Sequence, residues 1–139
     1  MRIKINNQKN KIMKILNLTQ HKATPDQIAE GVYDYENHNL IQQLITFDEM
    51  PTFSDMIDRA DELAKLVIEE GADAAMIGGA PYFMPILEFV LFRSNITPLY
   101  SFSKRVSEDT VMPDGTIQKT SVFKHQGFYE ATPVICEDV

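Results

Sequence analysis

The feature that most constrains the fold is a strand–loop–helix pattern near the start of the chain. Residues 13–18 form an apolar run that is typical of a buried strand. After a short polar loop, Thr24 suits the N-cap of a helix and Pro25 suits its first position. Gln27 stands three residues after Thr24 and completes a capping box. Because α/β domains bind ligands where the carboxyl end of a strand meets a helix N-terminus, the pattern predicts a binding position in this loop.

Strand and helix signals alternate along the rest of the chain. We expect a first helix over about 25–32, a strand over 40–47, a helix capped by Thr52 or Ser54 and ended by Gly71, a strand over 74–77, a helix over about 82–93 and a strand over 98–103. Segments 106–112 and 116–123 flank Asp114-Gly115, a dipeptide typical of hairpin turns. Alternation with short links implies βαβ crossovers. We therefore predict an α/β fold, a compact Rossmann-like three-layer sandwich with a mainly parallel sheet and a C-terminal β-hairpin; the strand order stays open.

Length and charge set the domain organisation and limit the class of partner. A chain of 139 residues with 44% apolar residues can build one hydrophobic core, and we place this single domain at residues 13–139. Residues 1–12 contain four bases and no acid, so we expect a flexible basic N-terminal extension: Arg2, Lys4, Lys9 and Lys11. The net charge of −7 argues against extended duplex nucleic acid as a partner, because phosphate contacts need clustered Lys and Arg.

Several classes of protein and of site are not supported by the sequence. No apolar run approaches the roughly 18–20 residues that span a bilayer, and no secretory signal is visible, so we expect a cytoplasmic protein with no membrane contact. Cys136 is the single cysteine, which excludes a disulfide within the chain. His21, His38 and His125 share no metal-ligand spacing, and the glycine-rich turn at 78–81 has neither the dinucleotide nor the P-loop pattern. We therefore expect no metal and no cofactor.

Two strand ends carry the first candidate ligand-binding residues. If the first and third strands are neighbours at a topological switch point, their carboxyl ends place Asn17, Thr19 and His21 beside Gly78 and Gly79. Glycines at a strand-to-helix turn allow backbone N–H groups to approach an anion, although tight packing of the turn would also require them. We predict that the largest polar crevice is lined by residues 17–21 and 78–81.

The fourth predicted strand adds further candidates. Ser101 and Ser103 alternate along it, and Lys104 and Arg105 follow directly. At the carboxyl edge of a parallel sheet these side chains can face the same crevice, while a solvated turn is the alternative for the two bases. For His21, the alternatives are general acid catalysis, a phosphate contact or a hydrogen bond to the backbone alone.

A family resemblance rests on three segments. The motif Asn17-Leu18-Thr19-Gln20-His21-x-Ala23-Thr24-Pro25-x-Gln27 resembles the opening motif of small CRISPR-associated Rossmann-like proteins, in which a strand ends in Ser-His or similar before a Leu-Thr-x-x-Gln helix start. The turn from Ile77 to Pro81 and the stretch Ser101-x-Ser103-x-Arg105 are similar to those of a related bacterial and phage family. The similarity covers about residues 13–129. Gln20 stands where some relatives have Ser, and the hairpin region is longer than in the minimal members.

The resemblance implies binding of cyclic oligoadenylates and, as in several relatives, metal-independent cleavage of the ring by 2′-hydroxyl attack. It makes His21 the candidate catalytic residue, with a small anionic nucleotide as ligand and a homodimer as the assembly. The candidate ligand-binding residues are Asn17, Thr19, Gln20, Gly78, Gly79, Ala80, Ser101, Ser103, Lys104 and Arg105. The alternative is a non-catalytic interaction or regulatory protein of a phage or mobile element, which an exposed apolar patch on the predicted 82–92 helix would favour.

Overall fold

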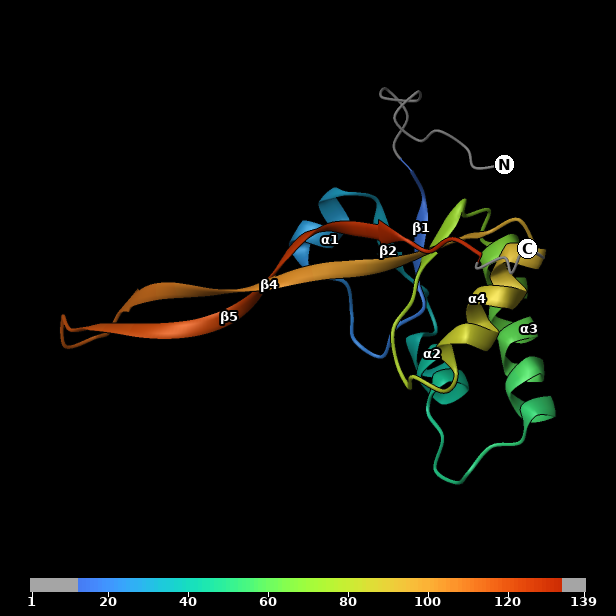
Figure 1. Ribbon diagram of the computed structural model, residues 1–139. Helices are drawn as coiled ribbons and strands as arrows, with labels where there is room; N and C mark the ends of the chain where they lie inside the picture. The colour runs from blue at the N-terminus through green and yellow to red at the C-terminus, as the bar shows by residue number, and fades with distance from the viewer. Residues whose placement is uncertain (1–12, 134–139) are drawn as a thin grey trace, which may run out of the picture.

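One five-stranded sheet organises residues 13–133, the part of the chain that the computed structural model describes (Figure 1). Its strand order is β2–β1–β3–β4–β5. The strands are β1 (Ile15–Asn17), β2 (Val32–Asp34), β3 (Ala74–Met76), β4 (Thr97–Val111) and β5 (Ile117–Glu130). β1 pairs in parallel with β2 and β3, β3 pairs in parallel with β4, and β4 and β5 are antiparallel. The predicted mainly parallel sheet with a C-terminal hairpin is confirmed.

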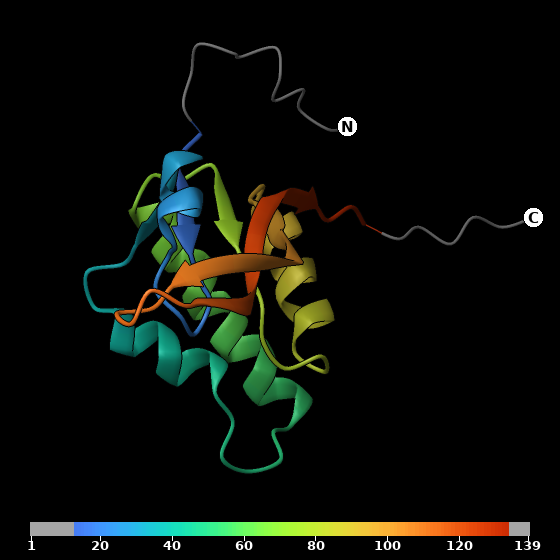
Figure 2. The same cartoon turned by 90° about the vertical axis from the view of Figure 1, so that its left-hand side faces the viewer.

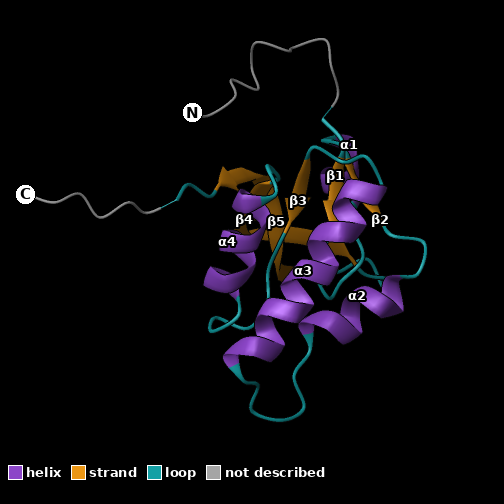
Figure 3. Cartoon of the chain, turned by 90° about the vertical axis from the view of Figure 1, so that its right-hand side faces the viewer, coloured by secondary structure: helices purple, strands orange, loops and turns teal. Residues whose placement is uncertain are grey.

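Helices cover both faces of this sheet. They are α1 (Pro25–Ala29), α2 (His38–Ile45), α3 (Phe53–Glu69) and α4 (Met84–Arg93). Figure 3 shows α2, α3 and α4 together on one face, and in Figure 1 α1 lies on the other. The result is the three-layer arrangement that the alternating pattern predicts. The predicted basic extension at residues 1–12 and the single cysteine, Cys136, lie outside the described residues.

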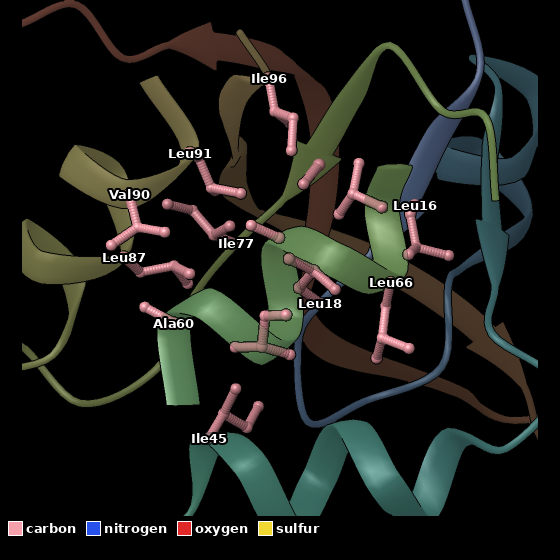
Figure 4. Packing of buried hydrophobic residues seen from close by; sticks show 14 of the residues in the cluster. Leu16, Leu18, Ile45, Ala60, Leu66, Ile77, Leu87, Val90, Leu91 and Ile96 are labelled. Carbon is pink, nitrogen blue, oxygen red and sulfur yellow. The ribbon is translucent and has the colours of Figure 1, made fainter. Parts of the chain in front are cut away.

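Each face of the sheet has its own apolar cluster, because side chains alternate along a strand. On the side of α2, α3 and α4, the cluster includes Leu16 and Leu18 together with fully buried leucines of α3 and α4 (Figure 4). Ile15, one residue before Leu16, belongs instead to a smaller cluster on the α1 side. Within residues 13–133, no helix is long and apolar enough to cross a membrane.

The capping signals in the sequence define the ends of α1 and α3. Thr24 accepts the backbone N–H of Gln27, and the Gln27 side chain accepts the backbone N–H of Thr24, so the predicted capping box is formed. Thr52 caps α3 by accepting the backbone N–H of Asp55. Gly71 follows this helix with φ of 70°, a conformation that glycine adopts without strain.

Two predictions about the first third of the chain are wrong. Residues 40–47 are not a strand, because Leu40, Ile41, Leu44 and Ile45 recur at helical spacing and form the inner face of α2. The second strand is instead β2, whose Val32 was expected to end the first helix. Gly31, with φ of 108°, turns the chain out of α1 so that β2 can pair with β1.

The C-terminal hairpin is longer than expected. β4 does not stop at residue 103 but continues to Val111, and it pairs with β5 over nearly its whole length. Figures 1 and 2 show the two strands projecting from the body on the α1 side, away from the other helices. The predicted Asp-Gly turn is confirmed: Gly115 has φ of 88°, and Asp114 accepts the backbone N–H of Thr116. The Thr116 hydroxyl and backbone hydrogen bonds lower the pKa of Asp114.

Candidate functional site

A crevice of about 570 Å³ opens at the carboxyl ends of β1 and β3 and beside residues 100–103 of β4. Seven of the residues expected to contact a ligand line it: Thr19, Gln20, His21, Gly78, Gly79, Ser101 and Ser103. Lys22, Thr24, Gln27, Met76, Ile77 and Tyr100 complete the lining. Since these residues come from two strand ends and from within β4, segments far apart in sequence, the tertiary structure brings the predicted segments into one site.

The parallel pairing of β1 and β3 explains why the two turns meet. β1 has β2 on one side and β3 on the other, so the chain reverses its order across the sheet at this point. Asn17 at the end of β1 is in register with Met76 at the end of β3. A Cβ atom built on Gly78 would lie 3.7 Å from the Cγ2 atom of Thr19. The predicted proximity of the two turns is therefore confirmed.

Asn17 supports the site from beneath and is not part of the crevice lining. Its side chain is fully buried. Its Nδ2 donates to the carbonyl of His21 at 2.7 Å and to Oδ1 of Asp34 at 2.8 Å, and its Oδ1 accepts the backbone N–H of Thr19 at 2.9 Å. Asn17 was predicted to contact a ligand, but its side chain instead has a structural role and fixes the shape of the loop after β1.

His21 lies on a loop that separates two hollows. It is exposed and lines both the crevice and a second pocket of about 470 Å³ that also includes His38 and Glu36. The backbone carbonyl of Gln20 accepts the side-chain amide of Gln42 and lies 3.0 Å from Nε2 of His38. These contacts fix the loop backbone while the His21 ring stays accessible to a ligand.

Besides Asn17, three further residues expected to contact a ligand lie outside the crevice lining. Lys104 and Arg105 were expected at the end of a strand, but β4 continues through them into the projecting hairpin. The Arg105 guanidinium lies 4.9 Å from the ring centroid of its cross-strand partner Phe123. Ala80, after the glycine pair, is likewise absent from the lining. The basic contribution to the crevice comes instead from Lys22, which the sequence pattern did not indicate.

The sequence pattern did not indicate Tyr100 either. Its hydroxyl donates to Oε2 of Glu88 on α4, and the residue is part of the crevice lining. Burial, together with this hydrogen bond and the negative charge of Glu88, raises the pKa of Tyr100 well above its ordinary value. Tyr100 is therefore an uncharged lining residue of the site and does not act as a base near neutral pH.

A hydrogen-bonded chain of polar side chains closes one side of the crevice. Ser101 Oγ lies 2.6 Å from Nδ1 of His125, and Nε2 of His125 lies 2.8 Å from Oε2 of Glu30. Gln27 Nε2 donates to Ser101 Oγ at 3.2 Å. No local motif could have indicated this group, because the three residues are distant in sequence: β4–β5 pairing brings Ser101 to His125, and the end of α1 supplies Glu30.

The largest polar hollow was predicted at the strand ends, and this prediction is wrong. A pocket of about 930 Å³ lies where the loop between α2 and α3 stands away from the two helices. Its lining includes Asp48, Asp55 and Arg59, and none of the predicted site residues. Arg59 donates to the carbonyls of Gln43 and Thr46, so its cation holds the C-terminal end of α2. Among residues 13–133, no group of three or more His, Cys, Asp and Glu side chains could hold a metal ion.

Comparison with known proteins identifies the family but no activity. The search of curated proteins and the search of solved structures found no match. The family model described as "Uncharacterized protein MJ1673 family" matches residues 13–129, which include every strand and helix of the described fold except the last residue of β5. The chain belongs to the MJ1673 family of uncharacterized proteins.

Proposed function

We propose that the crevice binds a small anionic ligand of the nucleotide class, with cyclic oligoadenylates as the first candidates. The observation that carries this proposal is the convergence of two strand-to-helix turns and a pair of serines on one hollow at the switch point of the sheet. In open α/β sheets, this is the usual position of a ligand.

The polar groups of the lining suit a ligand with few phosphates. Ser103 offers a hydroxyl donor, whereas the Thr19 hydroxyl already donates to Oδ1 of Asn17. The glycine pair 78–79 leaves backbone atoms uncovered by side chains. Lys22 is the single Lys or Arg among the lining residues. One cation among neutral donors can balance a phosphodiester or two, whereas an extended polyanion needs a series of bases. If the bound ligand is cleaved, His21 is the group we assign to protonate the leaving oxygen.

Binding can be tested with cyclic tri-, tetra- and hexa-adenylate, using AMP and ATP for comparison. A ligand that binds the folded state raises the melting temperature by mass action, by an amount that grows with its concentration. At 100 times the dissociation constant, the stabilisation is about 2.7 kcal/mol. The compounds are tested at 100 µM, about a hundredfold above a micromolar dissociation constant. An unchanged melting temperature with all of them would exclude the nucleotide proposal.

Two variants locate the ligand. Gly78→Ala adds a methyl group at ordinary contact distance from Thr19, so the fold tolerates it while the crevice narrows. Lys22→Gln removes the cation, and affinity should fall and become less dependent on salt. Lys65→Gln on α3, which is exposed and remote from the crevice, is the matched control and should bind as the unaltered protein does. If Lys22→Gln and Lys65→Gln lower the affinity equally, the ligand binds outside the crevice.

The projecting hairpin favours a second candidate function, a protein-interaction arm that joins two copies of the chain. A two-stranded ribbon outside the main sheet is marginally stable in water, yet this one exposes large apolar side chains. Val111, Ile117 and Phe123 share one face by their cross-strand register and are 71%, 65% and 69% exposed. In contrast, Tyr82 and Phe89 near and on α4 are more scattered, at 53% and 56%. Light scattering should show a dimer that Phe123→Ser converts to monomer; a monomeric unaltered protein would refute the arm.

A further inference from the structure

We propose that Ser101 is a nucleophile, with His125 as its general base and Glu30 as the residue that orients His125. The substrate class, a phosphodiester in the crevice, rests on the proposed function. The covalent chemistry of Ser101 does not, and it can be tested by itself. This assignment replaces the ribose 2′-hydroxyl, the nucleophile that the family resemblance implies, with a group supplied by the protein.

The direction of every hydrogen bond in the group follows from the partners. Gln27 Oε1 accepts the backbone N–H of Thr24, so the amide orientation is fixed and Nε2 must point to Ser101 Oγ. Glu30 can only accept when ionised, so Nε2 of His125 carries the proton between them. Nδ1 of His125 is then left as an acceptor, and it receives the hydroxyl proton of Ser101 at 2.6 Å. This is the arrangement in which a histidine can remove a proton from a serine.

The sheet holds His125 in place with a bulge. Phe102 pairs with Gly127, but Ser103 pairs with His125, so Gln126 is an extra residue on β5. Without this extra residue, the strict alternation of side chains would turn His125 to the opposite face from Ser101. The imidazole is only 3% exposed and packs against Phe128 with ring centroids 4.7 Å apart. A base is thus excluded from water while its serine lines the crevice.

Every bond and proton of the proposed cleavage is accounted for by these side chains and one water molecule. Ser101 Oγ attacks phosphorus, an Oγ–P bond forms, the P–O bond to the leaving ribose breaks, and the serine proton passes to Nδ1 of His125. Glu30 stabilises the resulting imidazolium, and His21 donates a proton to the leaving oxygen. Water then attacks phosphorus of the seryl phosphodiester, which still carries the other nucleoside; the proton of this water returns to His21, and Ser101 leaves with the proton held by His125. The net reaction consumes one water and gives a phosphomonoester and an alcohol.

A fluorophosphate ester tests the nucleophile without any nucleotide. Attack by Ser101 on diisopropyl fluorophosphate displaces fluoride and leaves one diisopropylphosphoryl group, which intact mass spectrometry detects and peptide mapping locates. We expect one adduct on Ser101, none in Ser101→Ala, and labelling at least about 100-fold slower in His125→Asn, the lower limit for removal of a general base. Glu30→Gln changes an exposed side chain and should fold normally while slowing the labelling. Ser107→Ala, an exposed serine farther along β4, is the control and should label like the unaltered protein.

The outcomes separate this inference from the proposed function. No adduct on the unaltered protein, or equal labelling of folded His125→Asn, overturns the nucleophile. If Ser101 is labelled but no cyclic oligoadenylate binds, the nucleophile stands and the proposed ligand class is refuted. If a cyclic oligoadenylate binds but Ser101 is not labelled, the ligand class stands and the nucleophile is refuted. If a cyclic oligoadenylate is cleaved, a 2′-O-methyl analogue should still react and the product should be a phosphomonoester. A 2′,3′-cyclic phosphate would show that the ribose hydroxyl attacks instead.

Discussion

Replacement of Asn17 by alanine should destabilise the whole fold and loosen the crevice at the same time. The side chain makes four hydrogen bonds, to His21, to Asp34 and twice to Thr19, and is fully buried. A net contribution of about 1 kcal/mol each gives an upper value of about 4 kcal/mol. Water can reach the carbonyl and hydroxyl of the exposed loop, which recovers part of this. We expect a loss of about 2–4 kcal/mol in the free energy of unfolding.

The measurement is a urea titration followed by circular dichroism, with thermal unfolding as a second reading. For a domain of this size, each kcal/mol lowers the melting temperature by roughly 4 °C, so a fall of about 8–16 °C is expected. Asn39→Ala makes the same chemical change on the exposed surface of α2 and should stay within about 0.5 kcal/mol of the unaltered protein. A loss below about 1 kcal/mol in Asn17→Ala, or equal losses in the two variants, would refute the assigned role of Asn17.

Three further perturbations have defined outcomes. Leu63→Ala on α3, where Leu63 is fully buried, should cost about 2–5 kcal/mol in a urea titration, and Ile68→Ala, 58% exposed, much less. Burial, with the negative charge of Glu70, raises the pKa of Tyr33 to about 12, so the melting temperature should fall as the pH rises from 10 to 12. Tyr33→Phe should make this fall smaller, and an unchanged pH profile in the variant would contradict the role of Tyr33. Gly115 has φ of 88° and open space around it, so Gly115→Ala strains only the backbone and should lower the free energy of unfolding by about 1 kcal/mol. Amide hydrogen exchange should become faster at the hairpin tip, and faster exchange throughout the core would contradict a local effect.

The pocket at the strand ends illustrates where the sequence interpretation succeeded. The loop 17–21 and the turn 78–79 could be paired in advance because each follows an apolar strand, and parallel strands end at the same edge. The interpretation failed for residues 40–47, where two pairs of apolar residues around Gln42 and Gln43 fit a short strand as well as one face of a helix. It also failed for Lys104 and Arg105, since the length of β4 depends on its partner β5.

Local chemistry in the sequence determined the capping box at Thr24, the end of α3 at Gly71 and the Asp-Gly turn, because each depends on atoms within a few residues. The alternation of apolar segments was enough to predict the α/β class. Only the tertiary structure decided that Ser101, His125 and Glu30 touch. Their contact requires an extra residue on β5 and the approach of α1 to the edge of the sheet, and neither leaves a periodic signal in the chain.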